Sequence, residues 1–376
     1  MSGEGRGATG RPAGRPGRLR VAVLMGGRSS EHDVSLASAR SVIAALDPER
    51  YETVPVEIGR DGRWALPAAG AGAPPVAELD PATRMLAPAA TPRPRPEGPA
   101  GTLPVPGAGG ALSPAGALGD VDVVIPVLHG PFGEDGTVQG LLELAAIPYV
   151  GSGVGASAVC MDKDFFKKVL RDSGIPVARH VALRDGDPVE NPFGYPVFVK
   201  PARLGSSIGI SKVRTPDELE PAVALARRHD DKVLIEEFVE GVEVECSVLG
   251  NRRPVASIPG EIVAHADWYD FAAKYDAGGM ELLVPPRLDD ATIARVQEVS
   301  IAAFVATECE GMARADCFVR PDGSVLVNEL NTIPGFTPTS VYAKLFEASG
   351  IPYAELLDRL VELALERHER RARLEY

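Results

Sequence analysis

The sequence predicts an α/β protein whose N-terminal part is doubly wound and whose remainder is of the α+β type. An apolar strand at 19–27, a helical pattern at 30–46 and a second strand at 51–58 form a β–α–β start, which is typical of a doubly wound domain. Two later strand patterns, at 193–200 and 208–213, are joined by a loop too short for a helical crossover. That connection predicts antiparallel strands in the second half.

The composition indicates a soluble globular protein with room for two or three domains. The chain has 376 residues, 45% of them hydrophobic, and a net charge of −13, which provides no broad basic face for nucleic acid or an anionic membrane. No apolar run approaches the roughly 18 residues of a membrane span. Four cysteines without metal-ligand spacing predict reduced, buried thiols and a cytoplasmic location. They are Cys160, Cys246, Cys309 and Cys317.

The N-terminal unit, residues 19–151, is predicted to be Rossmann-like and to follow a disordered tail at 1–18. Ser30 is the expected N-cap of its first helix, with Asp33 three residues later. After an interruption, the pattern resumes with a strand at 121–130, a helix at 137–146 and a short strand. In the interruption, 65–119, Ala, Pro and Gly make up 36 of 55 residues, so we interpret it as a disordered surface insertion, with a functional lid as the alternative.

Two further units are predicted, at 152–240 and 241–376. In the first, a helix over 162–174 precedes the two antiparallel strands, followed by a helix at 217–229 and a strand at 232–238. The second is expected to contain a strand at 242–249, a long irregular stretch at 259–287, a helix near 290–307, strands at 313–319 and 324–330, and a C-terminal helix at 353–368.

The loop KPARLGSSIGI, residues 200–210, has the composition of a phosphate-binding loop in an unusual order. Lys200 precedes the glycines, whereas the lysine of a Walker loop follows them, and the G-x-G-x-x-G spacing of dinucleotide-binding folds is absent. The residues of the loop alone therefore leave its architecture open.

The two strands around Pro321-Asp322-Gly323 predict a hairpin that carries a cation site. A two-residue turn at Asp322-Gly323 would place Asp316 opposite Glu329 and Arg314 opposite Asn331. Two opposed carboxylates repel each other, and a bound cation removes the repulsion. Carboxylates with an amide oxygen suit Mg²⁺ held jointly with substrate phosphates. The alternative is a solvated charged face in which Arg314 neutralises one acid.

Three other segments are ambiguous when they are considered singly. Glu31 follows a glycine turn at a helix N-terminus, where it could complement the helix dipole or receive a substrate ammonium at the carboxyl end of a strand. The stretch 233–243 is compatible with a plain strand at a domain edge, and 268–276 with an aromatic surface loop.

Together, eight segments resemble, in order, the motifs of the D-alanine–D-alanine ligases of the ATP-grasp superfamily. The resemblance covers roughly residues 20–365 and is interrupted only by the insertion. It implies a pre-ATP-grasp domain followed by a two-lobed ATP-grasp fold. The segments are GGRSSEHDVS, LHGPFGEDGTVQG, GSGVGASAVCMDK, KPARLGSSIGISKV, VLIEEFVEGVE, YDFAAKYD, RADCFV and NELNTIPGFTPTS.

For ATP, the resemblance implies phosphate contacts from Lys163 and Lys200, with Ser206 and Ser207 in the loop that folds over the phosphates. The adenine and ribose pocket would be lined by Glu236, Glu237, Phe238, Val239 and Glu243, and further ATP contacts would come from Lys274, Asn328 and Glu329. Two Mg²⁺ or Mn²⁺ ions would be held by Asp316, Glu329 and Asn331. Glu237 stands where some relatives carry lysine, which leaves the role of its side chain open.

For the substrates, the resemblance implies that Glu31 takes the ammonium of a first D-alanine and that His129 lies nearby. Arg314 and the backbone of Gly335 would stabilise an oxyanion, and Ser340 would hold the carboxylate of a second D-alanine. Tyr275, on a mobile loop, would bond Ser206 and Glu31, with Lys274 directed toward phosphate. His32 stands where some relatives carry arginine, a variation that the motif tolerates.

The implied reaction joins two D-alanines through a D-alanyl phosphate, with ATP consumed, for peptidoglycan precursor synthesis. A D-alanine–D-lactate or D-alanine–D-serine ligase is the alternative within enzymes, and the pair Lys274-Tyr275 favours the dipeptide. A non-catalytic ATP-binding protein of the same fold is the alternative outside enzymes. Analogy with the family implies a homodimer.

Overall fold

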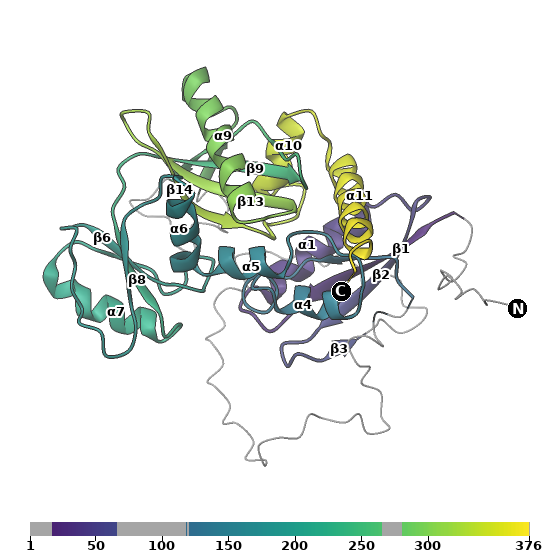
Figure 1. The fold of residues 1–376 in the computed structure, drawn as a ribbon, viewed down its shortest axis with the longest axis horizontal. Helices are drawn as coiled ribbons and strands as arrows, with labels where there is room; N and C mark the ends of the chain where they lie inside the picture. Colours follow the sequence, from purple (N-terminus) through teal and green to yellow (C-terminus); the bar gives the residue numbers. More distant parts are fainter. Residues whose placement is uncertain (1–16, 66–117, 119, 265–279, 376) are drawn as a thin grey trace, which may run out of the picture.

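A computed structural model describes residues 17–65, 118, 120–264 and 280–375 of the chain, and these residues form three sheets (Figure 1). The strand orders are β3-β2-β1-β4, β5-β8-β6-β7 and β12-β11-β9-β13-β14, with β10 paired to β9. The predicted tail, most of the 65–119 insertion, and Lys274 and Tyr275 lie outside the described residues. Among the described residues, none of the helices is both long and apolar enough to cross a bilayer.

The first sheet has the predicted doubly wound arrangement. Its strands β1 (Leu19–Gly26), β2 (Tyr51–Ile58) and β4 (Val123–Pro126) are parallel, with the short β3 (Trp64–Ala65) antiparallel at one edge. Because successive side chains alternate between the faces, β1 contributes to two cores. One contains α1 (His32–Ala45) and α11 (Tyr353–Ala372), and the other contains α4 (Thr137–Leu144).

The second sheet is antiparallel throughout, as the short loop predicted. Its strands are β5 (His180–Leu183), β8 (Val233–Glu237), β6 (Val197–Pro201) and β7 (Ser211–Val213), with Val197 of β6 opposite Val213 of β7. A one-turn 3₁₀ helix, η1 (Pro216–Glu218), leads into α7 (Leu219–Arg227), which covers the face that carries the valines of β6. The opposite face carries the polar residues of the site.

The third sheet combines three long strands with three short ones. The long strands are β9 (Val242–Gly250), β13 (Gly311–Val319) and β14 (Val325–Asn331), and the short ones are β10 (Val255–Ala256), β11 (Gly260–Ala264) and β12 (Met280–Leu283). One face packs on α5 (Val154–Met161), α6 (Lys163–Asp172) and α9 (Asp290–Ala306). On the other face, α10 (Val341–Ala348) lies against β9, where the Ser247 hydroxyl donates to the Tyr342 carbonyl at 3.3 Å.

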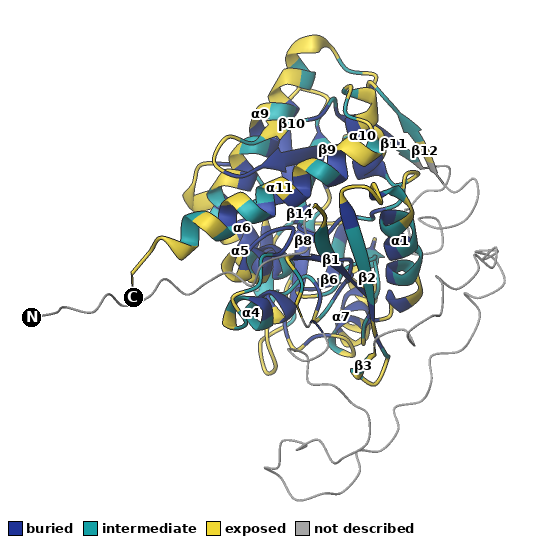
Figure 2. Cartoon of the chain, turned by 90° about the vertical axis from the view of Figure 1, so that its right-hand side faces the viewer, coloured by how far each residue is buried: buried dark blue, intermediate teal, exposed yellow. Residues whose placement is uncertain are grey.

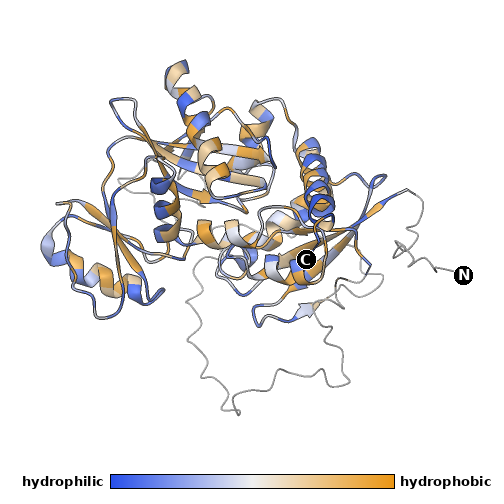
Figure 3. Ribbon diagram, in the orientation of Figure 1, coloured by the Kyte–Doolittle hydropathy of each residue, from blue (hydrophilic) through white to orange (hydrophobic). Residues whose placement is uncertain are grey.

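Apolar side chains fill the cores between the sheets and the helices, and polar side chains cover the outer sides of the helices, as hydrophobic burial requires. Figure 2 shows buried residues along β9 and β1 and exposed residues on the outer sides of α9 and α11. Figure 3 shows the same division as apolar strands and mixed helices. Two cores cross the predicted units: α11 packs with β1, and α6 packs with β13 and β14. The boundaries at 151/152 and 240/241 stay a prediction.

The hairpin between β13 and β14 has the predicted pairing of functional residues but not the predicted turn. Arg314 opposes Asn331 and Asp316 opposes Glu329, as expected. The loop, however, has three residues, because the Arg320 amide donates to the Ser324 carbonyl at 2.9 Å and Gly323 is left-handed, with φ at 78°. A bulge at Asn328 then compensates for the extra loop residue, since Cys317 opposes Val327.

Three local predictions are corrected. Helix α1 begins at His32 with Glu31 at its N-cap and no side-chain cap, because the Ser29 hydroxyl, rather than Ser30, organises this turn by accepting from the Glu31 amide at 3.3 Å. The stretch 259–287 contains β11 and β12 and so is not wholly irregular. The short strand after α4 is a single bridge between Tyr149 and Val124.

Candidate active site

The predicted site residues come from all three sheets and meet around α6. This helix lies between the second and third sheets, with β6 and β8 on one side and β13 and β14 on the other (Figure 1). Its first residue, Lys163, is buried, and its Nζ lies 3.4 Å from Glu329 on β14. The same Nζ donates to the Leu204 carbonyl at 2.8 Å. Lys163 therefore contacts both the β13–β14 hairpin, which carries the predicted metal ligands, and the glycine-rich loop.

Lys167, one turn after Lys163 on α6, belongs to a buried cluster of two lysines and one glutamate. Glu236 on β8 receives Lys200 at 2.5 Å through one carboxylate oxygen and Lys167 at 2.9 Å through the other. Burial raises the pKa of Glu236, but the two lysines outweigh that effect and lower it to about 2. Lys167 also donates to the Asn328 carbonyl at 3.1 Å, so this cluster connects the second sheet to the third.

The glycine-rich loop reaches the N-terminal sheet. Ser206 and Ser207 have left-handed backbones, with φ at 54° and 57°, a conformation that non-glycine residues rarely adopt and that is concentrated at ligand clamps. The Ser206 hydroxyl donates to the buried Glu31 carboxylate at the start of α1. The predicted phosphate loop and the predicted ammonium acceptor are thus in direct contact.

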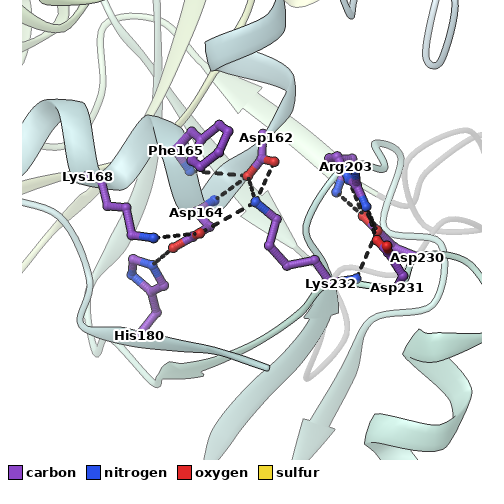
Figure 4. Close-up of polar contacts among 9 residues, drawn as sticks. All are labelled: Asp162, Asp164, Phe165, Lys168, His180, Arg203, Asp230, Asp231 and Lys232. Atoms are coloured by element: carbon purple, nitrogen blue, oxygen red, sulfur yellow. Dashed lines mark hydrogen bonds and ion pairs between the residues drawn. The ribbon is translucent and has the colours of Figure 1, made fainter. Parts of the chain in front are cut away.

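A network of ion pairs supports the base of this loop (Figure 4). Asp162 caps α6 by accepting from the Asp164 and Phe165 amides at 3.1 and 3.2 Å, and its two carboxylate oxygens lie 2.7 and 2.5 Å from Nζ of Lys232. Behind the loop, the Arg203 amide donates to Asp230 at 2.7 Å. These contacts hold the N-terminus of α6, and so Lys163, against the ends of β6 and β8.

The residues predicted around adenine, which lie on β8, directly after it or on β9, combine an apolar cluster with charged side chains. Val239 is buried with Leu326 and Ala178, and Phe318 packs against them. Phe238 is 39% exposed, and Nζ of Lys212 lies 4.3 Å from its ring centroid. The Glu237 carboxylate is engaged outside this wall by Arg179, whose Nε donates to it at 2.7 Å. Glu243 lies on β9, with its side chain on the same face as that of Phe318 opposite it.

The polar face of the third sheet contains the predicted metal residues. Arg314 donates to both oxygens of Asp316 at 2.7 Å, and the Asn331 amide donates to Asp316 at 3.1 Å. Burial lowers the pKa of Arg314, but Asp316 and Glu245 more than offset this and raise it well above its usual value. Within the described ranges, no three His, Cys, Asp or Glu side chains form a ready-made metal cage. An ion held here by Asp316, Glu329 and Asn331 would need ligands from a substrate, as Mg²⁺ sites on phosphates commonly do.

A buried polar cluster connects the first sheet to the segment after β14. His129 is buried, and its ring nitrogens lie 3.1 Å from the Ile333 carbonyl and 3.4 Å from the Ser38 hydroxyl. Burial lowers the pKa of His129, against the opposing attraction of Glu31. Burial first and the charge of Glu31 second raise the pKa of Glu134 to about 8, although the Gly130 amide donates to it at 2.6 Å. The carboxyl groups of Glu31 and Glu134 and the imidazole of His129 therefore share this end of the site.

The segment after β14 completes this end. A Cβ built on Gly335 would lie 3.1 Å from the Ser340 hydroxyl, so the Gly335 backbone and Ser340 are neighbours. Ser340 precedes α10, and its hydroxyl accepts from the Thr337 amide at 3.0 Å. The predicted oxyanion and carboxylate contacts are thus adjacent to each other.

The family follows from comparison with known proteins. Residues 20–152 match the family described as D-ala D-ala ligase N-terminus, and residues 169–362 match D-ala D-ala ligase C-terminus. D-alanine--D-alanine ligase A of Mesorhizobium japonicum is 49% identical in an alignment that covers 94% of this chain and 99% of the relative. The chain belongs to the D-alanine–D-alanine ligase family.

Two solved structures of ligases are also similar. The D-alanine–D-alanine ligase of Bacillus anthracis, complexed with ATP, has a TM-score of 0.71 and 29% identity, and the match covers 94% of this chain and 99% of that one. The VanG D-Ala:D-Ser ligase of Enterococcus faecalis has a TM-score of 0.75 and 31% identity, with coverage of 92% and 99%. Membership of this family confirms the predicted ATP-grasp fold.

Several residues of this family member that contact the site were not predicted from its sequence. Lys167 lies four residues after Lys163 on α6, a spacing that places both on one helix face and could have identified it. Glu245 lies two residues after Glu243 on β9 and so shares its face. No sequence signal identifies Glu134, because its proximity to Glu31 depends on how two loops of the first sheet pack.

Proposed function

We propose that this chain catalyses the ATP-dependent ligation of two D-alanines to D-alanyl-D-alanine, through a D-alanyl phosphate, for peptidoglycan precursor synthesis. The observation that carries the proposal is the position of Lys163. Its Nζ lies 3.4 Å from Glu329 on the face shared by Asp316, Asn331 and Arg314, and it also contacts the loop whose Ser206 reaches Glu31. We therefore assign the proposed phosphate-binding end and the proposed ammonium-binding end to one site.

At the nucleotide end, Lys163 and Lys200 would neutralise the phosphates, with the loop at Ser206 and Ser207 above them. Val239, Phe318 and Leu326 would face adenine through their apolar surfaces, with Glu236, Phe238 and Glu243 at its edge. The carboxylate of Glu237 is already paired with Arg179, so we assign only its backbone to this pocket. Lys274 and Asn328 are further proposed contacts.

Divalent cations would be held by Asp316, Glu329 and Asn331. The donor set fits Mg²⁺ or Mn²⁺, because carboxylate and amide oxygens are hard ligands on one strand-paired face. When bound, two such ions would offset the negative charge of the transferring phosphoryl group.

At the substrate end, Glu31 would bind the ammonium of the first D-alanine and leave its carboxylate directed toward ATP, with neutral His129 beside it. Phosphorylation makes that carboxylate reactive, because phosphate is a far better leaving group than oxide. The amine of the second D-alanine, held through its carboxylate by Ser340, would then attack. Arg314 and the Gly335 amide would stabilise the oxyanion of the tetrahedral intermediate. Tyr275 would help to exclude water from the acyl phosphate.

The acceptor is the main alternative. A D-lactate or D-serine acceptor would use the same activation step, and the VanG structural relative is described as a D-Ala:D-Ser ligase. We favour D-alanine because the relatives with the greater identity, at 46–49%, include several described as D-alanine--D-alanine ligases. A non-catalytic ATP-binding protein is disfavoured because the hairpin retains both acids, the asparagine and the arginine.

The decisive experiment measures ADP release with D-alanine, L-alanine, D-alanine plus D-lactate and D-alanine plus D-serine across pH. We expect release with D-alanine alone and a D-alanyl-D-alanine product, with no release for L-alanine. A product that contains D-lactate or D-serine in preference to a second D-alanine would replace the acceptor assignment. Absence of any D-alanine-dependent ADP release would refute catalysis.

By analogy with the family, we also propose a cytoplasmic homodimer that binds neither nucleic acid nor membrane. Light scattering coupled to size-exclusion chromatography tests the dimer directly. Cell fractionation tests the location.

A further inference from the structure

A row of three carboxylates crosses the polar face of the third sheet. Glu245 on β9 is opposite Asp316 on β13, and Asp316 is opposite Glu329 on β14. Directly opposed residues of antiparallel strands point to the same face, so the three side chains are neighbours. Glu245 and Asp316 are both buried, at 6% and 3% exposure. Such a row is stable only if cations lie within it.

Arg314 provides one of these cations, and its Nε atom lies between two of the acids. Nε is 2.7 Å from Oδ1 of Asp316 and 2.8 Å from Oε2 of Glu245. The N–H itself donates to Asp316, and the second arm of the guanidinium, Nη2, donates to the other Asp316 oxygen at 2.7 Å. Glu245 is thus an equally near second acceptor that the guanidinium can take by a small rotation.

The proposed use of Asp316 conflicts with this pairing. Arg314 and Asn331 together donate three hydrogen bonds to the two oxygens of Asp316. A divalent cation on Asp316 would take a remaining acceptor position of the carboxylate, and its positive charge would repel the guanidinium and weaken the hold of Asp316 on it. A buried guanidinium that loses its anionic partner is strongly destabilised unless another anion replaces it.

We propose that Glu245 is a positioning residue that takes over Arg314 when Asp316 binds a divalent cation. It would hold the guanidinium at the reacting carbonyl without acting as a metal ligand itself. The inference deepens the proposed function, because it rests on the roles given there to Arg314 and Asp316. It also explains why a buried acid on β9 faces the hairpin at the arginine.

The test is a titration with Mn²⁺ of the protein saturated with ADP, which supplies phosphate ligands to the ion, and the free Mn²⁺ is counted by electron paramagnetic resonance. In Glu245→Gln, Asp316 remains the strong acceptor for Arg314, so the arginine competes harder with the ion. We expect Mn²⁺ affinity to fall by about tenfold or more, as is typical when a partner behind a metal ligand is lost. The Mg²⁺ concentration needed for half-maximal ADP release is expected to rise in parallel.

The Arg314→Met background separates positioning from direct ligation. If Glu245 acts through Arg314, Glu245→Gln changes Mn²⁺ affinity by less than about twofold once the arginine is absent, because the two effects are not additive. An equal loss in both backgrounds would make Glu245 a metal ligand or a simple charge and overturn the proposal. So would unchanged Mn²⁺ affinity in Glu245→Gln alone.

Glu261→Gln is the matched control. Glu261 lies on the neighbouring strand β11, is also buried, and is also paired with an arginine, Arg287. It is expected to leave Mn²⁺ affinity unchanged. Glu245→Asp keeps the charge but withdraws it by one methylene, so it should show an intermediate loss and serves if the Gln variant does not fold. Failure of the wild type to release ADP with D-alanine would refute the proposed ligase but not this Mn²⁺ pattern, so the two outcomes are distinguishable.

Discussion

Replacement of Lys232 by methionine tests whether the ion network below the glycine-rich loop supports the proposed phosphate-binding end of the site. Lys232 is 1% exposed, and its Nζ lies 2.7 and 2.5 Å from the two carboxylate oxygens of Asp162 and 3.5 Å from Asp164 (Figure 4). Its Nζ also lies 4.2 Å from the centroid of the Phe165 ring, and methionine can fill this space without the charge. Lys232→Met therefore leaves Asp162 buried without its cation.

The expected cost follows from what Asp162 retains. Removal of one partner of a buried ion pair typically costs about 3–5 kcal/mol. Asp162 keeps the amides of Asp164 and Phe165 at 3.1 and 3.2 Å, so we take the lower end, about 3 kcal/mol. For 376 residues, at about 2.1 cal/mol/K of unfolding entropy per residue, that corresponds to a fall of about 4 °C in Tm. Because Lys163 follows Asp162 directly, the KM for ATP is expected to rise as well.

Scanning calorimetry and ADP-release kinetics on the same preparations measure both effects. Asp231→Ala is the matched control, because it breaks an ion pair with Arg203 in the same network whose side chains are 45% and 68% exposed. That pair is worth about 1 kcal/mol or less. The double variant Asp162→Asn/Lys232→Met should recover at least half of the lost stability, since no charge is left buried. A Tm for Lys232→Met no lower than that of Asp231→Ala would refute the reasoning.

Three further predictions concern the site and the insertion. Glu329→Gln is expected to abolish ADP release while the circular dichroism spectrum stays that of the wild type, and an active variant would contradict the metal assignment. Burial raises the pKa of Glu134 from 4.5 to about 8, so the wild type loses stability as pH rises from about 4.5 to about 8. The Tm of Glu134→Gln relative to that of the wild type should therefore rise with pH over this range and stay constant above it. A constant Tm difference across pH would exclude that titration. Deletion of residues 70–115 is expected to leave kcat near wild type, because no predicted site residue lies there, and a collapse of kcat would identify a lid.

In the loop KPARLGSSIGI, local sequence predicts the connection between strands but not the long-range contact. Its order excluded two common phosphate loops, and its short length predicted the antiparallel β6–β7 connection that the register confirms. What it could not provide was the partner of Ser206. Glu31 lies 175 residues away in the chain, and the two meet only because the loop reaches the first sheet.

In the β13–β14 hairpin, local sequence predicted the paired residues but not the turn that pairs them. The pairing of Asp316 with Glu329 was predicted from a two-residue turn, whereas the chain uses a three-residue turn and a bulge. The two departures cancel at the functional residues. A bulge is a small adjustment of backbone hydrogen bonds, and neither propensity nor alternation predicts its position.

The sequence by itself determined most of the longer strands and helices, the residues that share a face within each, and, through its motifs, the family and the candidate site. These properties depend on the two-residue repeat of strands, the 3.6-residue repeat of helices and the local chemistry of turns. Only the tertiary structure decided that Lys167 bridges two sheets, that Glu134 is buried beside Glu31 and that Glu245 faces Arg314. Those contacts join residues far apart in the chain, and they form because the cores around α6 and α11 press particular faces of distant elements together.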